Sequence, residues 1–207
     1  MKKVDWCDDN ERDIQFYTGL ADHYGVDVRS LDWGSRASQH LRFAVLAQLP
    51  LASASVLDVG CGLGDFWTWL AEKSLPVSYV GLDITPRMIE IARQRFPGVR
   101  FQTGDILDDF LGAEKFDYVV ASGIFAKRQT EPFEFLKAMA TKMFSLAHHG
   151  VGFNCLSSWA EQQEAGEFYA DPLELLAFAR TLTPWVALHH NYHPRDFTVF
   201  LYKAACR

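Results

Sequence analysis

The sequence is short of cysteine, and its few cysteines follow no functional spacing. Four of them are scattered along 207 residues with no CxxC pair: Cys7, Cys61, Cys155 and Cys206. Zinc sites and redox-active dithiols draw on closely spaced cysteines. We therefore predict no metal site and expect reduced thiols, as in a cytoplasmic protein.

Long apolar runs are also missing. A membrane-spanning helix needs about 20 consecutive apolar residues, and no stretch approaches that length. The opening MKKVDWCDDNERD has two lysines but no apolar run after them, unlike a secretory signal. We expect neither export nor a membrane partner.

The sequence also lacks an excess of positive charge. The formal net charge is −6, and Lys and Arg form no cluster. Proteins that bind phosphate backbones usually present a basic face. We therefore expect no nucleic-acid partner, and the length fits a single domain.

Short apolar runs alternate with helical patterns from Ser55 onward. Strands are predicted at 56–59, 77–82, 99–103, 116–121 and 151–155, and helices at 65–73, 86–95, 132–146 and 172–180. Strands that alternate with helices predict an α/β fold with a doubly wound, mostly parallel sheet. Two earlier helices, 11–24 and 38–49, predict a helical cap over residues 1–50, ahead of an α/β core at 51–207.

The last two strand-like runs depart from this alternation. PWVALHHNY and DFTVFLYK are separated only by His193, Pro194 and Arg195. Because so short a link has no room for a crossover helix, these strands are predicted to pair antiparallel. The sheet should therefore end with one antiparallel strand.

The stretch SVLDVGCGLGDFWTWL (55–70) has three glycines where a strand is predicted to give way to a helix. In open α/β sheets, ligands bind at this edge. A phosphate-binding P-loop needs Lys followed by Ser or Thr, but here Asp65 and Phe66 follow Gly64. A dinucleotide fingerprint needs a third glycine where Asp65 stands. Asp58 and Asp65 would also repel a pyrophosphate. A cationic ligand without phosphate suits the loop better.

DVGCGLG has the form of the first motif of class I S-adenosylmethionine-dependent methyltransferases, and the chain resembles this family, most firmly from Ser55 to Phe125. WGSRASQHLRF, SGIF, FNCLSS and RDFTVFLYK resemble a bacterial group of it with unknown acceptors. The resemblance implies a Rossmann-like methyltransferase fold, S-adenosylmethionine as cofactor and S-adenosylhomocysteine as product. It also implies that the glycines lie against the methionine part of the cofactor and that Asp58 lies near its ammonium.

Asp83 lies about 20 residues after the loop at the end of the second predicted strand, where a carboxylate binds a ribose diol. The family pattern places Ile84 and Met88 on the adenine ring, and Asp105 and Ile106 near its amino group. The expected cofactor-binding residues are Asp58, Gly60, Cys61, Gly62, Leu63, Gly64, Asp83, Ile84, Met88, Gly104, Asp105, Ile106, Ser122 and Arg36.

The acceptor is predicted at the fourth and fifth strand ends, under the cap. Enzymes that methylate nucleobases or glutamine amides typically carry an Asn/Asp-Pro-Pro-aromatic tetrapeptide after the fourth strand. SGIF at 122–125 does not match it. We therefore predict a small-molecule acceptor, bound by Tyr17, Tyr24, Trp33, Phe125 and Asn154.

Several alternatives stay open at this point. The acceptor could be a protein or peptide side chain, or the chain could be a non-catalytic S-adenosylmethionine-binding module; a nicotinamide dehydrogenase is disfavoured by Asp65. His148-His149 and His189-His190 lack the spacing of metal ligands on a helix. One of His190 and His193 is a candidate base, although methyl transfer needs a base only when the nucleophile arrives protonated. The sequence assigns no catalytic residue, acceptor atom or oligomeric state.

Overall fold

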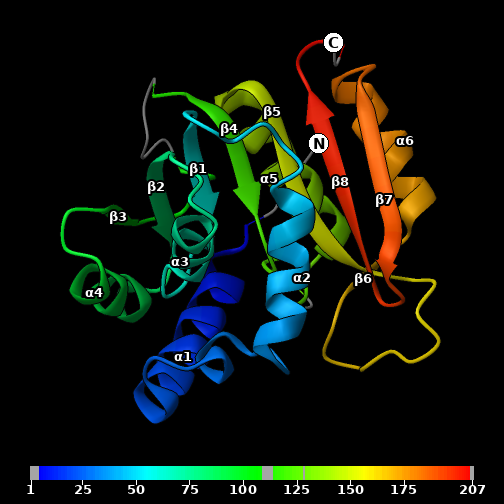
Figure 1. Cartoon of the computed structure of the whole chain (residues 1–207). Helices are drawn as coiled ribbons and strands as arrows, with labels where there is room; N and C mark the ends of the chain where they lie inside the picture. The colour runs from blue at the N-terminus through cyan, green and yellow to red at the C-terminus, as the bar shows by residue number, and fades with distance from the viewer. Residues whose placement is uncertain (1–4, 109–113, 128, 206–207) are drawn as a thin grey trace.

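The structure is a computed structural model that describes residues 5–108, 114–127 and 129–205. Its strands form one mixed sheet in the order β3-β2-β1-β4-β5-β8-β7, with β6 paired to β5 outside this path (Figure 1). Pairing is parallel except that β8 runs antiparallel to both β5 and β7. The strands are β1 Ser55–Val59, β2 Ser78–Asp83, β3 Arg100–Thr103, β4 Phe116–Ala121, β5 Ala147–Ser157, β6 Tyr169–Ala170, β7 Val186–His193 and β8 Asp196–Tyr202.

Helices cover both faces of this sheet. The helices are α1 Cys7–Tyr24, α2 Arg36–Leu46, α3 Asp65–Glu72, α4 Pro86–Arg95, α5 Pro132–Leu146 and α6 Pro172–Leu182, with a 3₁₀ helix η1 at Val28–Leu31. Side chains of α5 and α6 pack with Leu57, Val119 and Val151 in one core cluster. Side chains of α2, α3 and α4 pack with Val56 and Val120 in the other. Alternate strand residues therefore face opposite layers, as a doubly wound sheet requires.

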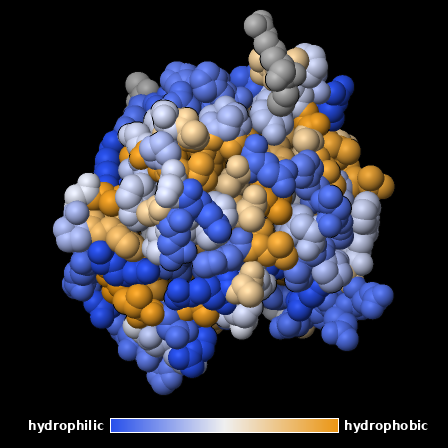
Figure 2. Space-filling model, viewed as in Figure 1, coloured by the Kyte–Doolittle hydropathy of each residue, from blue (hydrophilic) through white to orange (hydrophobic). Residues whose placement is uncertain are grey.

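Helix α1 lies beyond the edge at which β1 and β4 end, and α2 runs in front of the sheet with its first turns at that edge (Figure 1). This is the edge where open α/β sheets bind ligands. In the same view, hydrophilic residues alternate with apolar patches on the surface (Figure 2). No helix in the described part of the chain combines the length and apolarity needed to cross a bilayer.

The predicted α/β fold is confirmed, including the single antiparallel strand. The predicted bounds of α4 (86–95), β4 (116–121) and α5 (132–146) agree with the structure. The helix predicted at 38–49 was placed too late, because it begins at Arg36, with the Ser35 hydroxyl accepting from the N–H of Ser38, and ends at Leu46. η1 and β6 were not predicted, and β5 is longer than its predicted span of 151–155.

Candidate functional site

A cavity of about 570 Å³ lies at the carboxyl edge of the sheet, between the strand ends and the cap helices. Its volume is within the range of about 300–1,000 Å³ typical of small-molecule sites. The ends of β1, β2, β4 and β5 contribute lining residues, and so do α1 and α2. One end of the cavity lies at the glycine loop, and the other at the turn between β7 and β8.

The glycine loop is held by the neighbouring strand. The backbone N–H groups of Gly60 and Cys61 donate to the carbonyl oxygen of Leu82, at 2.7 and 3.1 Å. Gly60 and Gly62 have φ of 72° and 52°, in the left-handed region that favours glycine. A Cβ on Gly60 would lie 2.1 Å from Cγ2 of Ile124, so the loop fits closely against the segment after β4.

Asp83 ends β2 and is buried beside the loop. Its Oδ2 accepts from the N–H of Gly62 at 2.9 Å, and its Oδ1 accepts from the N–H of Thr85 at 2.8 Å. Burial raises the pKa of this carboxyl, although both backbone hydrogen bonds oppose the shift. A carboxylate offers about four lone-pair sites. The Thr85 side chain also forms a hydrogen bond with this carboxyl, and the lone pairs that these contacts leave free can accept from ligand hydroxyls in the cavity.

Asp58 lies under the loop with almost no solvent exposure. Its Oδ2 accepts from the hydroxyl of Tyr79 at 2.5 Å. Burial raises the pKa of Asp58 to about 7, helped by the negative charges of Asp83 and Asp65, while the Tyr79 hydrogen bond opposes the shift. A cationic group in the cavity would relieve this accumulated negative charge.

Helix α1 closes the cavity near Asp105. The Asn10 side chain donates to Oδ2 of Asp105 at 2.8 Å, and the N–H of Leu107 donates to its Oδ1 at the same distance. Gln129 donates to Asp13 at 2.5 Å, and the N–H of Thr130 donates to Asp9. These contacts join α1 to the segments after β3 and β4, so one element covers two strand ends. The remaining lone pairs of Asp105 can accept from a ligand.

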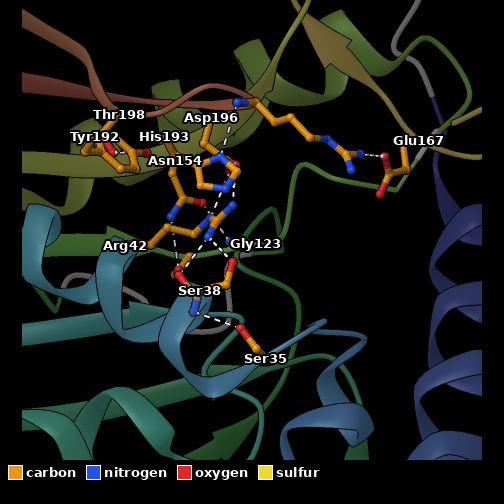
Figure 3. A network of polar contacts seen from close by, with 12 residues as sticks. Ser35, Ser38, Arg42, Gly123, Asn154, Glu167, Tyr192, His193, Asp196 and Thr198 are labelled. Carbon is orange, nitrogen blue, oxygen red and sulfur yellow. Dashed lines mark hydrogen bonds and ion pairs between the residues drawn. The ribbon is translucent and has the colours of Figure 1, made fainter. Parts of the chain in front are cut away.

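The other end of the cavity is a polar network (Figure 3). Asn154 of β5 accepts from the N–H of Gly123 at 2.9 Å and donates to the Ser122 hydroxyl at 3.1 Å. Arg42 of α2 forms a buried ion pair with Asp196 at the start of β8. Asn154 therefore links β5 to the segment after β4, and the ion pair between Arg42 and Asp196 links α2 to β8 at the same end of the cavity.

Most of the predicted site residues meet at this cavity. The predicted cofactor residues that line it are Asp58, Gly60, Cys61, Gly62, Asp83, Ile84, Met88, Gly104, Asp105, Ile106 and Ser122, and the predicted acceptor residues that line it are Tyr17, Trp33 and Asn154. The residues predicted for the cofactor and those predicted for the acceptor therefore line the same cavity.

Five predicted residues do not line the cavity, each for a local reason. Leu63 packs with Met88 in a small core cluster, and Gly64 begins α3 against Phe101. Arg36 is exposed at the start of α2. The Tyr24 ring lies under the guanidinium of Arg29, 4.6 Å from its centroid. Phe125 is buried against the rings of Phe135 and Phe153.

The sequence did not single out several lining residues at the β7–β8 end. They are Arg42, Glu167, Arg195 and Asp196. Arg195 donates to Glu167 at 2.9 Å and to the Tyr169 hydroxyl at 2.7 Å. The only local signal was the short HPR link, which predicts a tight turn but not which side chains it presents. Within the described residues, no group of three or more His, Cys, Asp and Glu is arranged to hold a metal ion.

Comparison with known proteins identifies the family. Residues 51–192 match the family described as "Methyltransferase domain". The Mycobacterium tuberculosis protein Rv1506c, named as a methyltransferase, is 33% identical over 162 residues, which are 73% of this chain and 94% of that protein. The chain belongs to the methyltransferase domain family and is an enzyme of this class.

Other relatives match over shorter stretches. Magnesium-protoporphyrin O-methyltransferase of Rhodobacter capsulatus is 41% identical over 88 residues, 39% of this chain and 38% of that protein. Trans-aconitate 2-methyltransferase of Methylobacterium nodulans is 39% identical over 85 residues, 36% of this chain and 32% of that protein. The chain therefore matches only about a third of each of these two enzymes.

Solved structures share the fold. Magnesium protoporphyrin IX methyltransferase of Synechocystis, solved with S-adenosylmethionine bound, has a TM-score of 0.68 at 17% identity and covers 99% of this chain and 100% of that one. The CcbJ methyltransferase of Streptomyces caelestis has a TM-score of 0.67 at 16% identity and covers 92% and 98%. At these identities, the likeness concerns the arrangement of the sheet and helices.

Proposed function

We propose that the protein transfers a methyl group from S-adenosylmethionine to a small-molecule acceptor. The observation that carries this proposal is the buried Asp83 carboxylate, fixed by Gly62 and Thr85 and left with lone pairs for a ribose diol. It stands beside a glycine loop flanked by acids, which suits a cationic ligand and not a phosphate. Family membership gives the reaction class.

The other lining residues have matching roles in this proposal. Asp58 faces the ammonium of the methionine part. Burial and the charges of Asp83 and Asp65 disfavour its ionised form, and a nearby cation stabilises that form. Ile84, Met88 and Ile106 enclose the adenine ring, and Asp105 accepts from its amino group. When bound, the sulfonium supplies an already activated methyl group. The chain's own task is then to align the acceptor and to exclude water.

A small acceptor fits the enclosed space under α1 and α2, and the named activities of the relatives in Rhodobacter and Methylobacterium are consistent with it.

We propose further that the cap (1–50) and the core (51–207) work as one domain. We also propose that the protein works in the cytoplasm without a nucleic-acid partner, because Cys7, Cys61 and Cys155 are free thiols and the net charge is −6.

The test is calorimetric titration with S-adenosylmethionine, S-adenosylhomocysteine and NAD. We expect the first two to bind and NAD not to bind. Asp83→Asn should weaken both roughly 10- to 150-fold, because a hydrogen bond to a charged group contributes about 1.5–3 kcal/mol. Glu72→Gln, an exposed acid at the end of α3, is the matched control. Binding of NAD in place of the sulfonium compounds would show the assignment to be wrong.

A further inference from the structure

The positively charged side chains that line the cavity are all paired with carboxylates. Among the described residues, the Lys and Arg side chains in the lining are Arg42, Lys127 and Arg195. Arg42 pairs with the buried carboxylate of Asp196 (Figure 3). Nζ of Lys127 lies 2.7 Å from Oδ2 of Asp32. Nη2 of Arg195 lies 2.9 Å from Oε2 of Glu167. An anionic acceptor would therefore meet cations whose charge is already balanced.

Two further groups in the lining move this balance toward negative charge. Oε1 of Glu164 lies 3.7 Å from Nη2 of Arg195, so this guanidinium faces two carboxylates. Burial and the charge of Arg42 lower the pKa of His193, against the opposing charge of Asp196, so this ring adds no fixed cation near pH 7. The cavity therefore attracts a cationic acceptor and repels an anionic one.

One buried carboxylate in the lining has an oxygen atom that no hydrogen bond uses. Asp13 of α1 is only 8% exposed and lines the cavity. Its Oδ2 accepts from Gln129, in the segment after β4 where the acceptor is predicted, whereas its Oδ1 accepts no hydrogen bond within the described part of the chain. Nε of Arg12 lies 3.8 Å from Oδ1, too far for a hydrogen bond, and Arg12 also pairs with Asp9 at 2.9 Å. Oδ1 of Asp13 is therefore available to a ligand.

The charge of Asp13 is incompletely compensated by its protein neighbours. Burial raises the pKa of this carboxyl, and the hydrogen bond from Gln129 and the charges of Arg12 and Lys127 do not offset the shift. A cation at Oδ1 would stabilise the ionised form.

Tyr17 lies one helical turn beyond Asp13, on the same face of α1, and also lines the cavity. Burial raises the pKa of its hydroxyl, and the charges of Asp32 and Asp13 add to this shift, so the ring stays neutral. The face of a neutral aromatic ring attracts cations. One face of α1 therefore offers an ammonium group both a carboxylate oxygen and an aromatic ring.

We propose that the methyl acceptor carries a positively charged amine and that this ammonium group binds to Oδ1 of Asp13. This inference rests on the proposed function and names the substrate class of the same cavity. Asp13 determines specificity and takes no part in the transfer itself. A protonated amine has no lone pair with which to attack, so the methyl group goes to another atom of the acceptor.

The first experiment compares probes that share one body and differ in charge. Tyramine, tyrosol and hydroxyphenylacetate end in an ammonium, a hydroxyl and a carboxylate, and aminobutanol, butanediol and hydroxybutyrate repeat the series on an aliphatic body. Each is titrated by calorimetry into wild-type protein saturated with S-adenosylhomocysteine. We expect a cationic probe to bind about tenfold or more tightly than its neutral counterpart, and the anionic probe to bind most weakly. Equal affinities within each series, tighter binding of an anionic probe, or no binding of either cationic probe overturns the inference.

Asp13→Asn separates the ammonium contact from the fold. The asparagine oxygen can still accept from Gln129, so the affinity for S-adenosylmethionine should stay within a fewfold of the wild type, which also shows that the variant folds. The affinity for the cationic probe should fall by about 10- to 100-fold, and that for the neutral probe should not change. Glu11→Gln, which removes an exposed acid from the same helix, is the matched control. Undiminished binding of the cationic probe to Asp13→Asn contradicts the role of this carboxylate.

Lys127→Gln tests the charge argument in the opposite direction and leaves Asp13 in place. The substitution removes the cation paired with Asp32 and one of the charges that compensate Asp13. The affinity for the cationic probe should therefore rise by about two- to fivefold. An unchanged or lower affinity overturns the electrostatic basis of the inference. A wild type that binds no S-adenosylmethionine overturns the proposed function, whereas normal cofactor binding without a preference for cationic probes overturns this inference alone.

Discussion

At the scale of single residues, Asp58 shows how burial and ligand charge oppose each other. Its folded pKa of about 7 exceeds the unfolded value near 3.8, so the folded protein holds more protons between these two values. The contribution of Asp58 to the free energy of unfolding therefore falls as pH rises from about 4 to about 7. A bound cation favours the ionised form of Asp58, so the affinity for a cationic ligand should rise as pH rises.

The affinity for S-adenosylmethionine should accordingly increase about fivefold between pH 6 and pH 7, as Asp58 goes from about one-tenth to one-half ionised. Calorimetry over this range, in buffers of different ionisation enthalpy, measures both the affinity and the proton released. Asp58→Asn should bind more weakly and without this slope. A wild-type affinity that stays constant with pH would remove Asp58 from contact with the ammonium.

At the scale of elements, one ion pair joins α2 to β8. Arg42 and Asp196 have side chains only 5% exposed. Removing either partner leaves the other charge buried, so Arg42→Met and Asp196→Asn should each lower the free energy of unfolding by about 3–5 kcal/mol. The double variant should lose much less than the sum. Urea unfolding of the four proteins gives the coupling, and additive losses would mean that the two side chains act independently.

The sequence predicts the elements that depend on local pattern. The strand ending at Asp83 and the helix begun by Pro86 follow from spacing and first-turn proline, and so does the position of Asp83 in the site. Arg42 and Asp196 are 154 positions apart, and their meeting depends on β8 entering between β5 and β7. β6 has only two residues, so its pairing with β5 leaves no periodicity to detect.

At the scale of the whole molecule, the cavity lies between the cap and the sheet edge and is lined by both. A ligand that fills it should slow amide exchange in α1 and α2 as well as in the glycine loop. Hydrogen exchange with and without S-adenosylhomocysteine measures this, and α6, which contributes no lining residue, is the internal control. Slowing confined to residues 60–65 would mean that the cap takes no part in binding.

The buried pair between Arg42 and Asp196 also has a consequence for the order of synthesis. Translation proceeds at about 5–20 residues per second, so the separation of 154 residues corresponds to roughly 8–30 seconds on the ribosome. During that time, a nascent chain can assemble the glycine loop with Asp83 and Asp105, while the guanidinium of Arg42 still lacks its carboxylate. The two halves of the cavity are therefore completed at different times, and the half that carries His193 comes last.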